Sequence, residues 1–438
     1  MKSPFLIPLS TVALLATVVA QSPVALPPVA QAPAASPVFE QGVTLHASEL
    51  LPAELLQGAS YRVRDQVTTD GFMATFEIDS DFGLFTATGV SQAHQRLREI
   101  GAIRKLVDTS KSDLFAEGLK RSIEQPIDAV KNIVAHPVDA VKQAPATVGH
   151  FFSKIGSSIS RGAEKIQKKA AGAKENNTDA GAVAMETGKE VGNAAKNVAG
   201  FDKAKLDTAR QLGVDPYSDN PRLQEEMDKV TWAFFAGGLP LRIGAAVASA
   251  GVAVAATNMI GIPEDTYALT QSELALRDEQ SLIAMKVTGE DIKAFQSNEA
   301  LSTTRRHRMV TSLAAMPKTA GRGNVIRLAN SCTTAAQADF LINAMAILAE
   351  RQRAGFADYA SLKVLGRLPG ATTASGTLEV PAPVDYVTWT EQVAGFAQRD
   401  DLGDAPKAMV HTGTLSPAAT AGFTAAGWTL TGIPHLAR

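Results

Sequence analysis

The sequence predicts an α+β protein that is mostly α-helical, with an N-terminal β-meander and covering helix, a central Ala-rich helical domain and a small C-terminal α/β unit. Three observations support this class. Side chains between Tyr61 and Thr88 alternate between apolar and polar, as in a sheet with one buried face. Between Glu264 and Phe356, apolar side chains recur every three or four positions, which is typical of helices. Near the C-terminus, short β-like runs flank a helix, which indicates a parallel crossover.

Composition bounds the chemistry. The chain has 438 residues, 45% of them hydrophobic, and a formal net charge of -2. It is long enough for roughly two or three domains, and its hydrophobic content is ordinary for a globular protein. Without a large net charge it has no global attraction to nucleic acid or anionic lipid, so we expect no nucleic-acid partner. Cys332 is the only cysteine, which excludes an intrachain disulfide and a cysteine-based zinc site, and we expect it to be a small buried residue.

Residues 1–20 have the layout of a signal peptide: Lys2 gives a positive start, an apolar stretch follows, and small residues end at Ala20. We expect cleavage before Gln21 and export across the inner membrane, to the periplasm or beyond the cell, with membrane association as an option. The alternative is an uncleaved anchor helix. Residues 21–38 are rich in Pro and Ala and carry no charge, which favours an extended spacer.

Residues 39–110 are predicted to form a β-rich domain. Asp70-Gly71 is a strong turn signal between two alternating runs, so the segment 61–78 is predicted to be a hairpin. The run 84–88 would add a third antiparallel strand. A meander with one apolar face needs a cover. The segment 91–106 is predicted to be a covering helix because apolar residues recur in it at helical spacing, namely Leu97, Ile100, Ile103 and Leu106.

Residues 111–220 are predicted to contain amphipathic helices and a flexible linker. Two copies of a short repeat start at Pro126 and Pro137, and proline is tolerated in the first turn of a helix, so we expect two short helices. In the segment 151–169, Phe and Ile side chains lie opposite lysines. We interpret it as a helix packed on the domain with a solvated lysine face, and the alternative is contact with an anionic membrane surface. The membrane-contact candidates are Phe151, Phe152, Ile155, Ile159, Lys165, Lys168 and Lys169.

The stretch LGVDPYSDNP, over 212–221, is a turn-rich connector because each proline disfavours helix at the preceding residue. A charged helix and an Ala/Gly-rich segment follow it. This combination resembles a pattern in uncharacterised exported proteins of bacteria. The resemblance implies a location in the bacterial envelope and no known activity.

Residues 221–360 are predicted to form a helical domain around the apolar stretch 231–262. This stretch is long enough to span a membrane, but much of it is Ala and Gly, and joining its two arms would place Arg242 in lipid. Positive charge also precedes it where export would place the outer side, which opposes the positive-inside preference. We therefore expect a buried Ala-rich hairpin, with membrane insertion as the alternative.

The helices after the apolar stretch carry the densest basic cluster of the chain. One helix is predicted to be capped near Ser297 and to carry Leu301, Met309 and Leu313, and another extends over Thr333–Ala354. The arginines on the first would spread around its circumference. A solvated face is the favoured interpretation, and the alternative is an anion site. The anion-binding candidates on this helix are Arg305, Arg306 and Arg308.

Residues 361–438 are predicted to form a small α/β unit, with strands over 384–389, 408–412 and 428–431 and a helix that starts at Ser416-Pro417. Thr412, Gly413 and Thr414 would lie between the end of a strand and a helix N-terminus, where anions bind in open α/β sheets. We favour a structural turn there, and keep these residues as anion-binding candidates. His411 is a candidate acid or base.

The function that these patterns favour is that of a non-enzymatic exported protein of the bacterial envelope, which acts through protein or membrane-surface contacts. The common hydrolase motifs are missing, and neither a metal nor a cofactor is predicted. One alternative is a membrane-inserting or pore-forming protein that uses the segments 151–169 and 231–262. Another is an enzyme with a site near His411.

Overall fold

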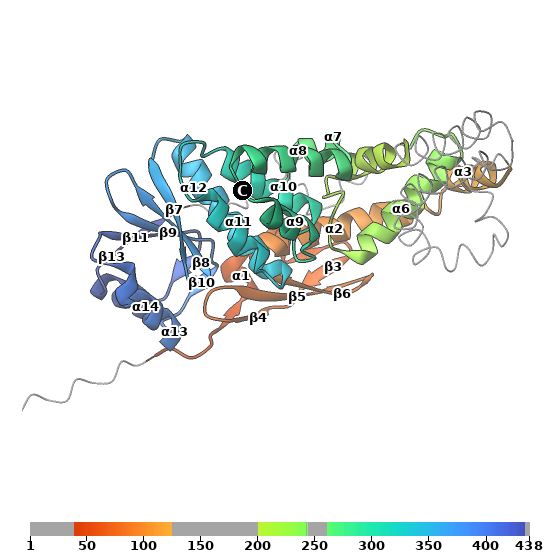
Figure 1. Cartoon of the computed structure of the whole chain (residues 1–438). Coiled ribbons are helices and arrows are strands. Elements are labelled where there is room, and N and C mark those ends of the chain that lie inside the picture. Colours follow the sequence, from red (N-terminus) through yellow and green to blue (C-terminus); the bar gives the residue numbers. More distant parts are fainter. Residues whose placement is uncertain (1–38, 125–199, 242, 244–260, 434–438) are drawn as a thin grey trace, which may run out of the picture. The chain divides into compact units, whose positions relative to one another are not determined.

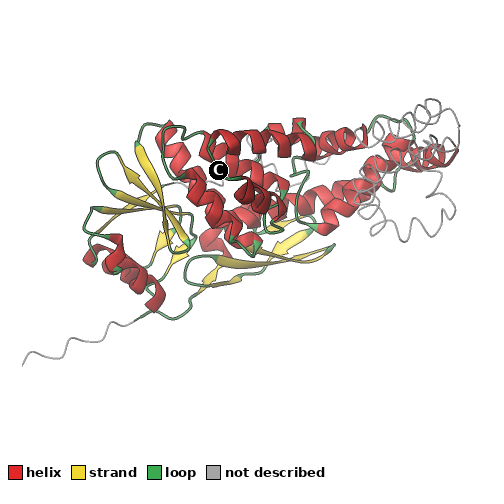
Figure 2. Cartoon of the chain, viewed as in Figure 1, coloured by secondary structure: helices red, strands yellow, loops and turns green. Residues whose placement is uncertain are grey.

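A computed structural model describes residues 39–124, 200–241, 243 and 261–433 (Figure 1). Its helices and its two larger sheets confirm the α+β, mostly helical class (Figure 2). Within these ranges, no helix is long and apolar enough to cross a membrane. Residues 1–38, which contain the predicted signal peptide and spacer, lie outside the described residues, as do the proline repeat and the segment 151–169.

The N-terminal sheet has the strand order β1-β4-β5-β3-β2, and β6 also pairs with β5. A tight turn over Asp70–Met73 joins β4 to β5, and the antiparallel β6 follows, so the predicted hairpin and third strand are confirmed. Two short helical segments lie between β1 and β2. The elements are β1 (Thr44–His46), α1 (Ala47–Leu50), η1 (Ala53–Leu55), β2 (Gln57–Gly58), β3 (Tyr61–Val63), β4 (Gln66–Thr69), β5 (Ala74–Ser80) and β6 (Gly83–Thr88).

Helix α2 (Val90–Thr109) covers this sheet, as predicted. Its residues Leu97 and Ile100 are buried in one cluster with Phe76 and Ile78 of β5. The same helix buries Ile103 in a second cluster, which is shared with later helices. Helix α2 therefore lies between the N-terminal sheet and the helical layer.

The second cluster joins α2 to α3 (Asp113–Glu124), to residues 200–212, which are helical, and to α6 (Pro221–Ala236). Asn220 caps α6 by accepting hydrogen bonds from the Arg222 and Leu223 N–H groups. The predicted apolar stretch begins inside α6, where Thr231 and Phe234 are buried. Residues 242 and 244–260 of that stretch lie outside the described residues, so the predicted hairpin stays a prediction.

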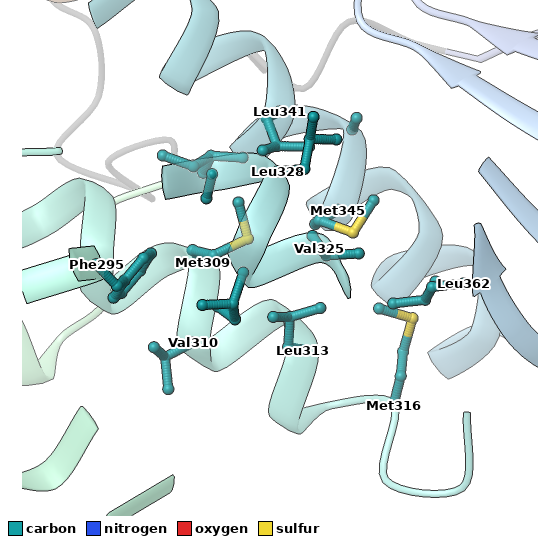
Figure 3. Packing of buried hydrophobic residues seen from close by; sticks show 14 of the residues in the cluster. Phe295, Met309, Val310, Leu313, Met316, Val325, Leu328, Leu341, Met345 and Leu362 are labelled. Atoms are coloured by element: carbon teal, nitrogen blue, oxygen red, sulfur yellow. The ribbon is translucent and has the colours of Figure 1, made fainter. Parts of the chain in front are cut away.

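A third cluster forms the centre of the next helices (Figure 3). The predicted helix over Thr333–Ala354 is confirmed as α12, but the helix predicted to be capped near Ser297 begins only after Ser302, because α9 ends at Ser297. Cys332 packs at the edge of this cluster and is half-buried rather than buried. The helices are α7 (Asp265–Ala268), α8 (Gln271–Ala284), α9 (Gly289–Ser297), α10 (Thr303–Ala314), α11 (Arg322–Asn330) and α12 (Ala335–Arg353).

The C-terminal sheet has the order β13-β11-β9-β8-β7, in which β11 runs parallel to both β9 and β13. The predicted strand, helix and strand are confirmed as β11, α14 and β13, and the predicted first strand is the short β10, which pairs with β12. Three strands, β7 to β9, are not predicted from the sequence. The elements are β7 (Tyr359–Leu365), β8 (Leu368–Thr373), β9 (Leu378–Ala382), β10 (Tyr386–Val387), α13 (Glu391–Ala397), η3 (Asp400–Leu402), β11 (Lys407–His411), β12 (Thr414–Leu415), α14 (Pro417–Ala425) and β13 (Trp428–Gly432).

Buried hydrogen bonds connect the C-terminal unit to the N-terminal sheet. The Asp385 carboxylate accepts from the N–H groups of Ala74 (2.9 Å) and Val90 (3.1 Å). The Phe72 carbonyl accepts from Asp385 N–H at 2.9 Å and Tyr386 N–H at 3.2 Å. These bonds place the start of α2 next to the C-terminal unit.

Candidate functional site

The three arginines that the sequence singles out on α10 have different surroundings. Arg305 is buried, and its guanidinium donates to both carboxylate oxygens of Asp339 at 2.8 Å and forms an ion pair with Asp219 at 2.8 Å. Arg306 donates instead to the Gln296 carbonyl at 2.7 Å. Arg308 donates from Nη2 to Asn343 Oδ1 at 2.8 Å. Helix α10 thus directs two of the three, Arg305 and Arg308, towards α12.

Arg305 and Arg308 line one cavity of about 210 Å³, which we call the arginine cavity. Thr412, a candidate from the C-terminal unit, lies in the same lining, so the structure brings together three predicted residues from distant parts of the sequence. The turn-rich connector contributes Asp215 and Asp219. Other lining residues that matter below are Met73, Thr88, Arg98, Glu99, Ala336, Asp339, Phe340, Asn343 and Asp385.

Helical spacing explains how α12 builds its wall of this cavity. Ala336, Asp339, Phe340 and Asn343 are separated by three or four positions and therefore share one stripe of the helix. The helix begins at a cap in which the Thr334 hydroxyl accepts from Gln337 N–H. The stripe is apolar at Ala336 and Phe340, and its two polar residues, Asp339 and Asn343, accept hydrogen bonds from the α10 arginines.

Arg98 of α2 is the third arginine in the lining and was not predicted. Its neighbours Leu97 and Ile100 are buried in the cover of the sheet, which turns Arg98 away from the sheet. Arg98 forms no ion pair with a carboxylate of the described residues, and its buried Nε has no hydrogen-bond partner there. The available signal was an arginine next to the apolar stripe of the predicted covering helix.

Most carboxylates around the cavity already have strong partners. Asp219 is held by Arg305 and by Arg96, whose Nη2 lies 2.6 Å from it. Burial alone would raise the pKa of Asp219, but these two arginines more than offset that effect and lower it. Glu99 accepts from Arg96 at 2.6 Å, and also from Ser218 and Asn220.

The arginines of the cavity differ in how well their charge is compensated. Burial lowers the pKa of Arg98 and outweighs an electrostatic interaction with Tyr267 that acts in the other direction. Burial also lowers the pKa of Arg308, although Asp339 and Asp215 act in the other direction. For Arg305, burial is outweighed by Asp339 and Asp219, and its pKa is raised. Arg98 and Arg308 are therefore the cations that the described residues leave without an ion-pair partner in this cavity.

Asp215 is the carboxylate whose charge is least supported. It is buried and accepts hydrogen bonds from the Thr304 hydroxyl at 2.6 Å and from Tyr217 N–H at 2.9 Å. Burial raises its pKa from the ordinary 3.8 to about 6, against the lowering effect of these two hydrogen bonds. Near neutral pH a part of the Asp215 population is therefore protonated.

The other C-terminal candidates do not reach the arginine cavity. Thr412 does line this cavity, but its hydroxyl already donates to the Val384 carbonyl at 2.8 Å. Gly413 packs against the backbone of residue 385, where an added Cβ would lie 2.2 Å from the carbonyl oxygen. Thr414 pairs with Tyr386 in the short sheet, and His411 Nδ1 lies 2.7 Å from the Gly413 carbonyl. The segment 411–414 is therefore a structural turn in which Thr412 lines the arginine cavity.

A second cavity, of about 370 Å³, lies next to the first, and we call it the apolar cavity. Four residues line both cavities, namely Met73, Thr88, Ala336 and Phe340. The rest of its lining is mostly apolar and comes from α11, α12, the C-terminal sheet and the helices α13 and α14. Buried members include Leu328, Leu341, Val380, Val387, Val393, Met409 and Phe423.

No family model, curated protein or solved structure matches this chain. The resemblance to exported bacterial proteins therefore stays a prediction. Among the described residues, no group of three or more His, Cys, Asp or Glu side chains is arranged to hold a metal ion. The membrane-contact candidates of the segment 151–169 lie outside the described residues.

Proposed function

We propose that the protein is an exported, non-enzymatic binding protein that holds the anionic group of a small ligand in the arginine cavity. One observation supports this most strongly. Arg98 and Arg308 come from different helices, line the same cavity and form no ion pair with a carboxylate of the described residues. Arg305, which is fixed by two aspartates, forms part of the same wall.

The physical argument is one of compensation. Burying a guanidinium without an anion is unfavourable, and the lowered pKa values of Arg98 and Arg308 express that penalty. A carboxylate or phosphate in the cavity would accept charge-assisted hydrogen bonds from both side chains. Each such bond contributes about 1.5–3 kcal/mol, because the site is partly shielded from water.

The neighbouring carboxylates repel this anion only weakly, because most of them have partners of their own. Asp339 and Asp219 are neutralised by Arg305 and Arg96, and Asp385 accepts two backbone N–H groups. Asp215 loses its charge as the pH falls below about 6. An anion near Arg308 therefore meets less repulsion than a simple count of acidic residues suggests.

Export and a non-enzymatic role are supported by the sequence. The layout of residues 1–20 favours a signal peptide, and the chain carries none of the common hydrolase motifs. His411, the predicted acid or base, does not line the arginine cavity. Contacts with a protein partner or an anionic membrane surface remain predictions, as does membrane insertion through the segments 151–169 and 231–262.

Thermal unfolding of the full chain tests the anion site. Inorganic phosphate, sulfate and acetate are titrated separately at an ionic strength held constant with chloride. We expect at least one anion to raise the unfolding temperature in a saturable way. Arg98→Gln and Arg308→Gln should each weaken the fitted affinity about 10- to 100-fold, the equivalent of one charge-assisted hydrogen bond.

Arg306→Gln is the matched control, because Arg306 has the same charge on the same helix and does not line the cavity. It should leave the affinity unchanged. The proposal is wrong if none of the three anions stabilises the chain, or if Arg306→Gln weakens binding as much as Arg308→Gln does.

A further inference from the structure

We infer that the ligand is an amphipathic anion whose hydrocarbon tail occupies the apolar cavity while its anionic group binds in the arginine cavity. This inference rests on the proposed function and adds the chemical class of the ligand. It depends on three properties of the two cavities: their shared wall, the chemistry of the second lining, and its volume.

The shared wall places the two cavities directly next to each other. Met73, Thr88, Ala336 and Phe340 contact both. Ala336 has the smallest side chain and leaves space on the α12 side of this boundary. Met73 is half-buried and unbranched, so its three rotatable bonds let it move aside at low cost. A single molecule can therefore extend from the arginines into the apolar cavity.

The lining of the apolar cavity suits hydrocarbon. Buried side chains from four elements contribute to it, among them Leu328 of α11, Leu341 of α12, Met409 of β11 and Phe423 of α14. Leu328 and Leu341 also belong to the core drawn in Figure 3. Its charged residues do not point to a polar ligand: Asp70 accepts hydrogen bonds from its own turn, and Arg367 is exposed. Apolar cavities of this kind offer water few hydrogen-bond partners and bind apolar molecules.

The volume sets the expected length of the tail. A cavity of roughly 150 Å³ lined by Leu, Ile and Phe holds a benzene ring. The apolar cavity, at about 370 Å³, is more than twice as large. By proportion it accommodates on the order of a dozen carbon atoms. The arginine cavity, at about 210 Å³, suits a compact group such as a carboxylate or phosphate.

Titration of the full chain with a homologous series of carboxylates measures how affinity depends on tail length. Acetate, butanoate, octanoate and dodecanoate are titrated by calorimetry below their micelle concentrations, together with dodecyl phosphate and neutral dodecanol. The association constant should rise about fourfold for each added methylene that is buried, up to the expected length. Comparing dodecanoate with dodecyl phosphate distinguishes a fatty acid from a phosphate-bearing lipid as the source of the anionic group.

Cys332 provides a second readout, since it lines the apolar cavity and is the only thiol of the chain. Bound dodecanoate should slow its alkylation by N-ethylmaleimide, whereas acetate should not. Cys332→Trp would fill part of the apolar cavity and should abolish the dependence on chain length while short anions still bind. Cys332→Ser is the matched control and should retain that dependence.

The outcomes separate the two proposals. If short anions bind but affinity does not increase from acetate to dodecanoate, the amphipathic ligand is excluded and the anion site stands. If dodecanol binds as tightly as dodecanoate, and Arg98→Gln and Arg308→Gln change nothing, the anion site fails instead. If no member of the series binds, both fail. The series uses the unmodified chain, so the test does not depend on Cys332→Trp folding.

Discussion

Arg305 and Arg308 lie three positions apart on α10, and the difference between them explains why one is structural and the other is available. Asp339 and Asp219 fix Arg305, so replacing it would leave Asp339 without its cation in a partly buried place, and Asp219 with Arg96 as its remaining partner. Arg308 has only the neutral amide of Asn343 as its hydrogen-bond partner among the described residues. An incoming anion would therefore displace no direct carboxylate partner of Arg308 among the described residues, although Asp339 and Asp215 act on it from further away.

Asp215→Asn should change how stability depends on pH. The folded-state pKa of Asp215 is raised from 3.8 to about 6, so its favourable contribution is complete below 3.8 and is lost as the pH rises through about 6. Charging this carboxylate costs about 3 kcal/mol. Asparagine keeps an acceptor for Thr304 and removes the charge. The unfolding free energy of the variant, relative to the original chain, should therefore increase by about 2–2.5 kcal/mol between pH 4 and pH 7.

Urea unfolding at the two pH values measures this difference. The other charges that act on Asp215 include Glu99, which raises its pKa, Arg305, which lowers it, and Arg308, with which it interacts. All of them remain in the variant, so their effects largely cancel in the comparison. A stability difference that stays constant between pH 4 and pH 7 would contradict the assigned pKa.

Part of the candidate site could be predicted residue by residue. A dense basic cluster identified Arg305 and Arg308, and the end of a predicted strand identified Thr412; all three line the arginine cavity. The same reasoning also selected Arg306 and Gly413, which do not line the cavity. A sequence pattern does not say which side of a helix or turn faces a cavity. Arg98 was missed because its role depends on contacts between residues hundreds of positions apart.

At the level of elements, the crossing of α3 and α6 depends on two glycines. An added Cβ at Gly118 would lie 2.7 Å from the Ala233 carbonyl oxygen, and one at Gly237 would lie 2.5 Å from the Gly118 carbonyl oxygen. Real Cβ atoms do not approach so closely, so the helices contact each other through backbone. This close approach fixes α6, and α6 in turn packs against α2 through their shared cluster.

Gly118→Ala should destabilise the chain by about 1–3 kcal/mol, since overpacking forces the two helices apart. Gly101→Ala is the matched control in α2, where nothing lies within 4 Å of the added Cβ. It should instead stabilise by about 0.5–1 kcal/mol, because alanine loses less conformational entropy in a helix. Thermal or urea unfolding of both variants shows whether each substitution raises or lowers the free energy of unfolding. Two stabilising substitutions would show that α3 and α6 do not pack this closely.

Local patterns predicted the elements that have strong periodicity and missed those that do not. The hairpin at Asp70-Gly71, the covering helix and α12 follow from regular apolar spacing. Strands β7 to β9 were missed because their segment lacks clean alternation and contains Pro369 and Pro381. The turn glycines Gly366 and Gly376, both with positive φ, were the available signal for these hairpins.

At the scale of the whole chain, two acidic side chains tie the C-terminal unit to the beginning of the chain. Asp385 accepts from backbone N–H groups at the start of β5 and of α2. Glu40 accepts from the Ser416 hydroxyl at 2.6 Å and from Trp389 N–H. These contacts hold the first strands, α2 and the C-terminal sheet around the two cavities.

Asp385→Ala should destabilise the chain by about 2–5 kcal/mol, because two buried N–H groups lose their acceptor. Asp385→Asn should cost less, since its carbonyl oxygen can still accept from one of the two. Urea unfolding followed by tryptophan fluorescence tests this order, and Asp400→Ala serves as the exposed control. Equal stability of Asp385→Ala and the original chain would mean that this connection contributes nothing.

The Asp385 contacts also constrain when the chain can finish folding. The N–H groups of Ala74 and Val90 receive their acceptor from Asp385, which lies 311 and 295 positions further along. During synthesis, these two bonds can therefore form only after most of the chain, up to Asp385, has been made. Contacts of such high sequence separation slow folding, because the loop between them must close first.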